Sequence, residues 1–235
     1  MKKTPIAISW SGGKDSSLML HQLLNDEKYE VVSLHTAISE ETQRVSMHGI
    51  SIDLIQAQAH SIGLPLDLIS IPSDLTNVSY ELALGKYYDT LFEQGIGHIG
   101  FGDIFLEDLK AYRDTLLSRS NLTGVYPLWQ KKTPDLANEF LSLGFETIIC
   151  CSNKSLFSTS ICGHAFTQTL LDTFSERIDP CGENGEFHTF AVDGPIFRSK
   201  IGITMKDVVT KNYEYKSEDG TKIKSAFDFV DIKLS

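Results

Sequence analysis

The hexapeptide Ser11-Gly12-Gly13-Lys14-Asp15-Ser16 decides the fold of this chain of 235 residues. Residues 6–10 before it form an apolar run of strand length, and residues 17–24 after it carry apolar side chains at the spacing of a helix packed on a sheet. The pattern predicts a strand, a glycine turn and the start of a helix. Glycines let successive N–H groups turn inward, and a helix N-terminus adds unpaired N–H groups, so we expect the loop to bind a phosphate.

The polar side chains of the hexapeptide suit the same ligand. Lys14 supplies a positive charge, while Ser11 and Ser16 supply hydroxyl donors. Asp15 would repel a phosphate unless a cation lies between them, so it either binds Mg²⁺ or caps the helix. The spacing differs from that of the Walker loop and resembles the SGGxDS signature of PP-loop pyrophosphatases. The alternative is an ordinary glycine turn that joins a strand to a helix.

Strand-like and helix-like segments alternate after this loop. The expected elements are strands at 29–36, 66–71 and 98–101 and helices at 52–62 and 77–94. Parallel strands need crossover connections, so the alternation predicts an α/β fold with a doubly wound parallel sheet. Ligands of such sheets bind beyond the carboxyl ends of the strands, where we place Gly12, Thr36 and Asp103. We expect the last helix to turn Val78, Leu82 and Leu91 inward.

The regular alternation of strand-like and helix-like segments is interrupted in the second half of the chain. A charged amphipathic helix is expected at 107–120, and prolines with a lysine pair follow at 124–132. We therefore predict a nucleotide-binding domain over residues 1–128 and a smaller C-terminal α+β subdomain over residues 129–235. The elements expected in the subdomain are helices at 135–143 and 166–174, strands at 145–151 and 189–192, and a hairpin of 201–215 and 223–234. An exposed edge of that hairpin would allow a homodimer.

Net charge and composition limit the classes of function that this chain can have. The net charge of −10 repels nucleic acid, which makes it an unlikely partner, and a hydrophobic content of 41% is ordinary for a globular protein. We find neither a signal peptide nor an apolar segment of bilayer length, and expect a cytoplasmic protein without membrane contact. The cysteines at 150, 151, 162 and 181 are expected as free thiols, because a zinc site with His164 would match no standard spacing.

A second informative stretch is Cys181-Gly182-Glu183-Asn184-Gly185-Glu186-Phe187-His188. Its glycines, glutamates, asparagine and histidine make a poor core. The stretch is therefore a candidate part of a site. The alternative is a polar turn that leads into a strand, with His188 as a partly buried strand residue.

With both stretches in view, the chain resembles the diphthine–ammonia ligase family of PP-loop ATPases, which have a Rossmann-like fold. The matching segments follow one another in the family order from about residue 5 to about residue 198. They are residues 11–16, 48–49, 102–104, 107–109, 112–113, 126–129 and 181–189. The resemblance implies an ATP-dependent amide ligase. A substrate carboxylate attacks the α-phosphorus of ATP, pyrophosphate leaves, and ammonia displaces AMP from the acyl adenylate.

The resemblance also assigns roles to residues. The implied nucleotide contacts are Ser11, Gly12, Gly13, Lys14, Asp15, Ser16, Thr36, Gly102 and Asp103. Mg²⁺ would be held by Asp15 and Asp103. The implied substrate contacts are His48, Tyr112, Trp129, Glu183, Asn184, Gly185 and His188. Lys14, Asp15, Glu183 and Glu186 are the expected catalytic residues. The carboxylates of residues 183–186 could bind an ammonium ion or cationic groups of the substrate, and one of them or His188 could act as the base.

The family acceptor is diphthine on translation elongation factor two, and free ammonium would supply the nitrogen. One alternative keeps the ATP chemistry and changes the acceptor to another small carboxylic acid or a tRNA base. A tRNA enzyme should show strong salt dependence and a basic face. Another alternative is a nucleotide-binding sensor without turnover, in which Lys14→Ala would abolish ATP binding with no catalytic rate to lose.

Overall fold

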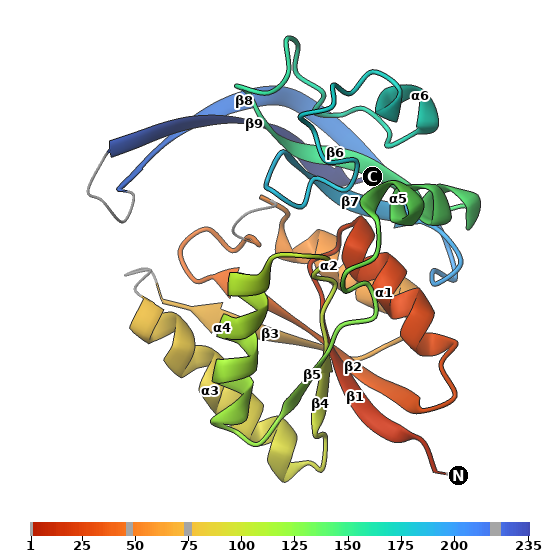
Figure 1. Cartoon of the computed structure of the whole chain (residues 1–235), viewed down its shortest axis with the longest axis vertical. Helices are drawn as coiled ribbons and strands as arrows, with labels where there is room; N and C mark the ends of the chain where they lie inside the picture. Colours follow the sequence, from red (N-terminus) through yellow and green to blue (C-terminus); the bar gives the residue numbers. More distant parts are fainter. Residues whose placement is uncertain (1, 46–48, 73–76, 217–221) are drawn as a thin grey trace.

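The computed structural model describes residues 2–45, 49–72, 77–216 and 222–235, which form two β-sheets with helices around them (Figure 1). The first sheet is parallel, with the order β3-β2-β1-β4-β5. Its strands are β1 (Thr4–Ser9), β2 (Tyr29–Ser39), β3 (Leu66–Ile71), β4 (His98–Gly100) and β5 (Thr123–Val125). The second sheet is antiparallel, with the order β7-β6-β9-β8. Its strands are β6 (Glu146–Asn153), β7 (Phe187–Asp193), β8 (Ile203–Lys216) and β9 (Lys222–Leu234).

The strand order of the parallel sheet confirms the predicted doubly wound fold. The chain runs outward from β1 to β3 on one side and returns to the other side of β1 with β4. Ile6, Ala7 and Ile8 of β1 are fully buried, which suits the central strand of a sheet covered on both faces. The topological switch lies between β1 and β4. The glycine loop after β1 and the segment 102–104 after β4 therefore meet at the ligand-binding edge of the fold.

Two pairs of helices cover the two faces of the parallel sheet (Figure 1). Helices α1 (Lys14–Leu24) and α2 (Ile52–Ile62) lie between the two sheets, and their apolar side chains share one core with residues of the antiparallel sheet. Helices α3 (Asn77–Glu93) and α4 (Glu107–Ser118) cover the other face around a second core. The parallel sheet thus has a buried face on each side.

Helix α3 corrects one expectation about its inward face. Val78 and Leu82 are 67% and 61% exposed, whereas Leu84, Tyr88 and Leu91 are buried. The buried residues follow one another at i, i+4 and i+7, which places them on one stripe of the helix. Leu82 stands two positions before Leu84 and so points to the opposite side. The inward position predicted for Leu91 is confirmed, and that of Val78 and Leu82 is wrong.

Elements of the second half differ from expectation in two places. Strand β5 was not predicted, because its three residues fall in the interrupted region before Pro127. The helix expected at 166–174 is the four-residue α6 (Gln168–Leu171). Helix α5 (Thr133–Ser142), strands β6 and β7 and the closing hairpin are confirmed. The domain boundary between residues 128 and 129 stays a prediction.

The antiparallel sheet is bonded directly to the helical layer beneath it. The Ala191 N–H in β7 donates to the Gly12 carbonyl at 2.8 Å, and the Arg198 N–H donates to the Ser61 carbonyl at 2.9 Å. An ion pair of 3.0 Å joins Arg44 to Asp231 of β9. These contacts fix the second sheet over the end of the first, beside the glycine loop. Within the described ranges, none of the helices combines the length and the apolar character needed to cross a bilayer.

Candidate functional site

The glycine loop, residues 11–16, has the strand–turn–helix geometry that the sequence predicts. Gly12 has a φ of +80°, and a Cβ added there would meet the Gln58 Oε1 atom at 2.6 Å. A side chain is excluded at this position by both backbone strain and contact. Gly13 is the N-cap residue of α1 and makes no side-chain cap hydrogen bond. The capping role of Asp15 stays a prediction, as does its role in binding Mg²⁺.

Hydroxyl groups tie the loop to itself and to the second sheet. Ser16 Oγ and Ser17 Oγ donate to the Gly13 carbonyl at 2.9 and 2.8 Å. The Gly13 N–H donates to Ser11 Oγ at 3.3 Å. The Lys14 N–H donates to Thr189 Oγ1 of β7 at 2.9 Å. Two N–H groups of the loop thus have side-chain acceptors, and the α1 N-terminus is anchored to β7.

Lys14 and Asp15 form a close ion pair at the start of α1. Lys14 Nζ lies 2.6 and 2.7 Å from the two carboxylate oxygens of Asp15, and Lys14 is 2% exposed. Burial alone would lower the pKa of Lys14, but the Asp15 carboxylate raises it above the ordinary value. Lys14 is therefore a buried, charged ammonium group. It can exchange one anionic partner for another without losing its charge.

Gln58 of α2 is a site-forming residue that the sequence analysis missed. Its side chain is fully buried, and its Nε2 donates to the carbonyls of Gly12 at 3.0 Å and Ala191 at 2.7 Å. Its Oε1 accepts from the Trp10 indole N–H at 3.0 Å. One amide thus connects the residue after β1, the glycine loop and β7. The signal in the sequence was a glutamine on the apolar face of a helix, one position before Ala59.

The end of β4 contacts the first turn of α1. A Cβ added to Gly102 would lie 3.0 Å from the Asp15 carbonyl carbon and 3.1 Å from the Ser16 nitrogen. A side chain at position 102 would therefore push the two backbones apart by a few tenths of an ångström. Asp103 follows and is 8% exposed, with the Arg113 Nε atom 2.8 Å from its Oδ2. Arg113, which lies over the Phe101 ring at 4.6 Å, is a second residue that the site assignment omitted.

Residues 179–186, here called the polar loop, bring Glu183 to the same edge. Glu183 Oε1 accepts from the N–H of Ile104 at 2.8 Å and that of Phe105 at 3.4 Å. Burial raises the pKa of Glu183 to about 7, against the opposite effect of the Ile104 N–H. The carboxylates and Lys14 influence one another, because Asp15 raises and Lys14 lowers the pKa of Glu183. The second half of the chain thus contributes a carboxyl group that titrates near neutrality.

Glu186 has a different environment from Glu183. It is 3% exposed and accepts from the Asp179 N–H at 3.1 Å, the Asn184 N–H at 3.0 Å and the Asn184 side-chain amide at 3.1 Å. All three donors belong to the polar loop itself. Glu186 therefore holds the loop in shape. Its predicted catalytic role remains untested.

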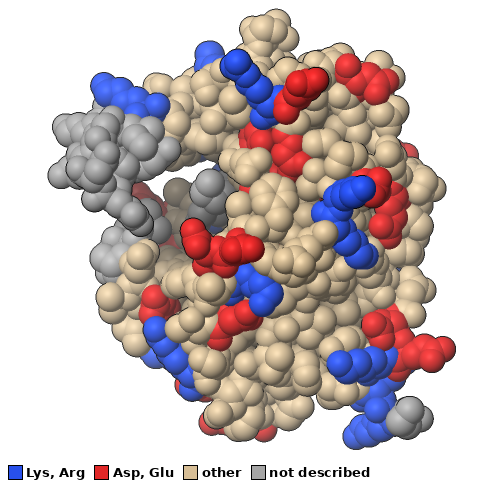
Figure 2. All heavy atoms as spheres, in the orientation of Figure 1, with Lys and Arg blue, Asp and Glu red and all other residues tan. Residues whose placement is uncertain are grey.

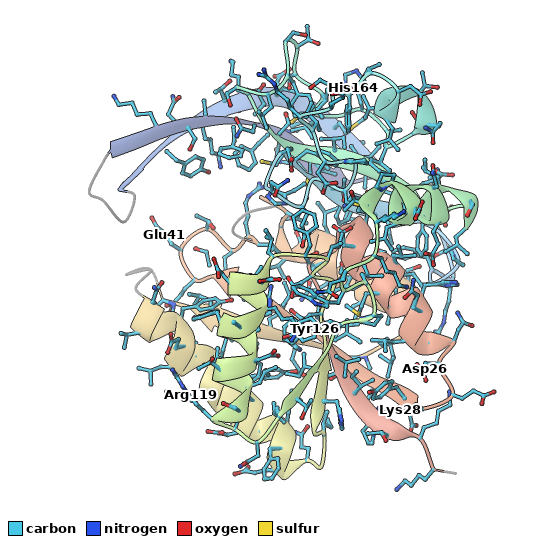
Figure 3. All side chains as sticks on the ribbon, viewed as in Figure 1. Asp26, Lys28, Glu41, Arg119, Tyr126 and His164 are labelled. Atoms are coloured by element: carbon cyan, nitrogen blue, oxygen red, sulfur yellow. The ribbon has the colours of Figure 1, made fainter. Side chains whose placement is uncertain are left out.

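The remaining predicted site residues lie around this centre. The Thr36 hydroxyl is buried and donates to the Trp10 carbonyl at 2.7 Å. Tyr112 is 36% exposed on α4, next to Arg113. Trp129 packs against Tyr126, with ring centroids 6.1 Å apart. Figure 3 shows Tyr126 beside α4, where its hydroxyl donates to Asp114 at 2.7 Å.

The polar loop also includes Asn184, which is exposed, and Gly185, which is half-buried and has a φ of +82°. His188 lies in β7, half-buried and opposite Cys151 of β6. His48 lies outside the described residues. The structure thus places Lys14, Asp15 and Gly102 in contact and adds Glu183 through residues 104–105, whereas the substrate roles of the other residues stay predictions.

The carboxylates of Asp15 and Asp103 are the predicted donors for a metal ion at this edge. In the part of the chain that the structure describes, no three His, Cys, Asp or Glu side chains are grouped as a metal site. All four cysteines are buried free thiols. The two carboxylates predicted to hold Mg²⁺ each have a cationic partner, Lys14 for Asp15 and Arg113 for Asp103.

Comparisons with known proteins agree over both halves of the chain. Residues 3–123 match the family model described as the diphthamide synthase N-terminal domain, and residues 132–226 match the diphthamide synthase C-terminal domain. The two matches together cover most of the chain and include both the glycine loop and the polar loop.

Curated relatives carry a corresponding name. The diphthine–ammonia ligase of Mus musculus is 25% identical over 228 residues, which are 87% of this chain and 84% of the relative. That of Bos taurus is 26% identical over 227 residues, which are 87% of this chain and 85% of the relative. That of Schizosaccharomyces pombe is 25% identical over 217 residues, 85% of this chain but 36% of the relative. Among solved structures, the U34-tRNA thiolase of Methanococcus maripaludis covers 61% of this chain and 59% of its own at 17% identity and a TM-score of 0.37.

Proposed function

The chain belongs to the diphthamide synthase family, and from that premise we propose that it is an ATP-dependent ligase that joins ammonia to the carboxylate of diphthine. The observation that carries the proposal is the meeting of two charged groups from the two halves of the chain. Buried Lys14 begins α1 in the glycine loop, and Glu183 of the polar loop has a pKa near neutrality at the same edge. An anion-binding centre and a proton-accepting centre are the two parts that an adenylating amide ligase needs.

The glycine loop supplies the nucleotide half of the proposed site. ATP phosphates would lie at the N-terminus of α1, where the helix dipole favours negative charge. Lys14 would exchange Asp15 for a phosphate oxygen, since it is already charged and buried next to the loop. Charge that develops on the leaving pyrophosphate would then face a preorganised ammonium group. Stabilisation of this kind is usually the largest contribution to catalysis.

The residues at this edge also fit a magnesium ion. Carboxylate oxygens are the ligands that Mg²⁺ prefers, and Gly102 lets the segment that carries Asp103 approach Asp15 closely. We propose that Asp15 and Asp103 would hold the Mg²⁺ that accompanies ATP, Asp15 after release from Lys14 and Asp103 beside Arg113. The ion would neutralise charge on the phosphates. Arg113 would remain next to Asp103 and orient it.

The polar loop supplies the acceptor half. At neutral pH a large share of Glu183 is unprotonated, so it can take a proton from the attacking ammonia and pass it to solvent. Its hydrogen bond from the Ile104 N–H fixes one oxygen and leaves the other for this task. Glu186 would keep the loop in place. We assign the role of the base to Glu183 rather than to His188, because the charges of Asp15 and Lys14 shift the pKa of Glu183.

The charge of the molecule disfavours a tRNA acceptor. The net charge is −10, and Figure 2 shows acidic and basic side chains interspersed over the face that it displays. A polyanion gains little from such a surface. A carboxylate on a protein or a small molecule is the acceptor class that we retain.

Product analysis tests the proposal. The protein would be incubated with ATP, Mg²⁺, ammonium and an elongation factor that carries diphthine. AMP, pyrophosphate and one new amide per turnover are the expected products. ADP and phosphate would contradict the adenylation step. ATP binding without turnover on any carboxylate would support the sensor alternative.

A further inference from the structure

Gln58 of α2 is a polar residue buried on the apolar face of its helix. The same face buries four hydrophobic residues, namely Leu54, Ile55, Ala59 and Ile62. Burial of an amide costs free energy that a methionine of similar length would not cost. The amide therefore offsets this cost through hydrogen bonds that an apolar side chain could not make.

The partners of Gln58 allow only one orientation of its amide. The Trp10 indole is a donor alone, and the Gln58 oxygen accepts its N–H at 3.0 Å. The carbonyls of Gly12 and Ala191 are acceptors alone, and Gln58 Nε2 donates to them at 3.0 and 2.7 Å. A reversed amide would set its oxygen against two carbonyl oxygens. The side chain is thus fixed on both sides of its amide, and a buried network of this kind is rigid.

This network determines the direction of the Gly12 carbonyl. The carbonyl accepts from Gln58 Nε2 and also, at 2.8 Å, from the Ala191 N–H of β7. Both bonds draw it toward α2 and β7. The Gly12–Gly13 peptide is trans, so its carbonyl and its N–H point in opposite directions. The Gly13 N–H is therefore directed away from α2 and β7, into the glycine loop.

The Gly13 N–H is well suited to bind an anion. It donates to Ser11 Oγ at 3.3 Å, which is longer than an ordinary N–H···O bond. Such a bond to a neutral hydroxyl is readily exchanged for a bond to a charged phosphate oxygen. The Lys14 N–H, by contrast, has a shorter bond of 2.9 Å to Thr189. Of these two N–H groups, that of Gly13 is the more readily released.

We propose that Gln58 is a positioning residue for the phosphates of ATP, which holds the Gly12 carbonyl so that the Gly13 N–H meets a phosphate oxygen. The inference rests on the proposed function and adds to it a residue of α2 that acts through the loop backbone. Because the same amide bonds the Ala191 carbonyl, it also fixes the loop against β7. Gln58 thus aligns the nucleotide-binding loop with the sheet of the second half.

Binding measurements on Gln58→Met test this role. Methionine keeps the length of the side chain and removes its three hydrogen bonds. Calorimetry in the presence of Mg²⁺ would give the dissociation constants of ATP, inorganic pyrophosphate and AMP. The constants for ATP and pyrophosphate should rise about tenfold, because both ligands place the pyrophosphate portion in the loop. The constant for AMP, which lacks that portion, should stay as in the wild type.

Ser61→Ala is the matched control, since Ser61 is buried on the same helix. Its hydroxyl donates to the Ser199 carbonyl at 2.6 Å and accepts from the Ser199 N–H at 3.1 Å. Its removal should lower the thermal midpoint of unfolding, as that of Gln58 does, but leave the ratio of the ATP and AMP constants unchanged. An equal change of this ratio in both variants would show a structural role alone and overturn the inference.

Trp10→Phe loosens the same amide from its other side and keeps both Gln58 donor bonds. It should weaken ATP and pyrophosphate by about threefold without affecting AMP, and it decides the question if Gln58→Met does not fold. Wild-type affinity for ATP in a folded Gln58→Met variant would overturn the inference and leave the proposed function intact. A wild type that binds neither ATP nor pyrophosphate would overturn the proposed function and this inference with it.

Discussion

The glycine loop and the polar loop meet at one edge of the molecule but are built differently. The glycine loop is held from outside by Gln58 and Thr189, and its backbone conformation depends on Gly12. The polar loop is held from within by the Glu186 carboxylate. The glycine loop brings the Lys14–Asp15 ion pair to the shared edge, and the polar loop brings Glu183. The difference teaches that the proposed nucleotide-binding loop is part of the core, whereas the proposed acceptor-binding loop is a self-contained loop docked against it.

The largest effect is expected from Lys14, because it carries the charge of the nucleotide half. Lys14→Ala should lower turnover by about a hundredfold, as loss of one preorganised stabilising group does. Steady-state kinetics and circular dichroism would measure the rate and the fold. Lys28, which Figure 3 labels far from the glycine loop, provides the control Lys28→Ala. Equal rates for Lys14→Ala and the control would show that Lys14 does not carry the proposed nucleotide half of the site.

A substitution of Glu183 tests the proposed acceptor half of the site by itself. Glu183→Gln should lower amide formation by about tenfold or more, since the amide cannot accept the proton. Binding of ATP should stay as in the wild type. Calorimetry with ATP and mass analysis of the acceptor would separate the two effects, with Glu176→Gln as an exposed control from the same region. A loss of ATP affinity would instead assign Glu183 to the binding of the nucleotide.

Glu186 should affect stability more than chemistry. Glu186→Gln replaces an acceptor of three hydrogen bonds by a group that accepts at only one oxygen. The free energy of unfolding should fall by about 1 to 3 kcal/mol, and the KM for the acceptor should rise while that for ATP holds. Urea denaturation and kinetics would measure both. A wild-type stability with a lost chemical step would instead make Glu186 catalytic.

The smallest effect is a dependence of rate on pH. With the pKa of Glu183 at about 7, the rate of amide formation at a fixed concentration of free ammonia should rise with pH and be half-maximal near that value, because the unprotonated carboxylate is the base. The residual rate of Glu183→Gln should lack this rise, and His188→Gln should keep it. Loss of the rise in His188→Gln alone would assign the base to His188.

The fold could be predicted from the sequence because local patterns determine it. Alternating strand and helix signals gave the parallel sheet, and the glycine pair gave the loop at its edge. The exposed Val78 and Leu82 and the short strand β5 were missed, because few residues define a helix face or a three-residue strand. Lys14 was predicted from its loop. The Gln58 contacts join segments more than forty residues apart, and no local pattern encodes them.

The polar loop was harder to interpret for the same reason. Its composition marked it as unusual, but the separate roles of Glu183 and Glu186 depend on how the loop closes. Glu186 turns back to its own loop, and Glu183 reaches the backbone at Ile104, which is 79 positions away. Two glutamates three residues apart look equivalent in a sequence. Only their burial and hydrogen bonds distinguish them.

Exchange of labelled pyrophosphate into ATP tests the division between the two loops most directly. The assay needs the acceptor carboxylate and Mg²⁺ and leaves out ammonium, so that it reports reversible adenylation alone. The wild type and Glu183→Gln should both catalyse exchange, and Lys14→Ala should not. Amide formation by the wild type without any exchange, or exchange that disappears in Glu183→Gln, would contradict the account.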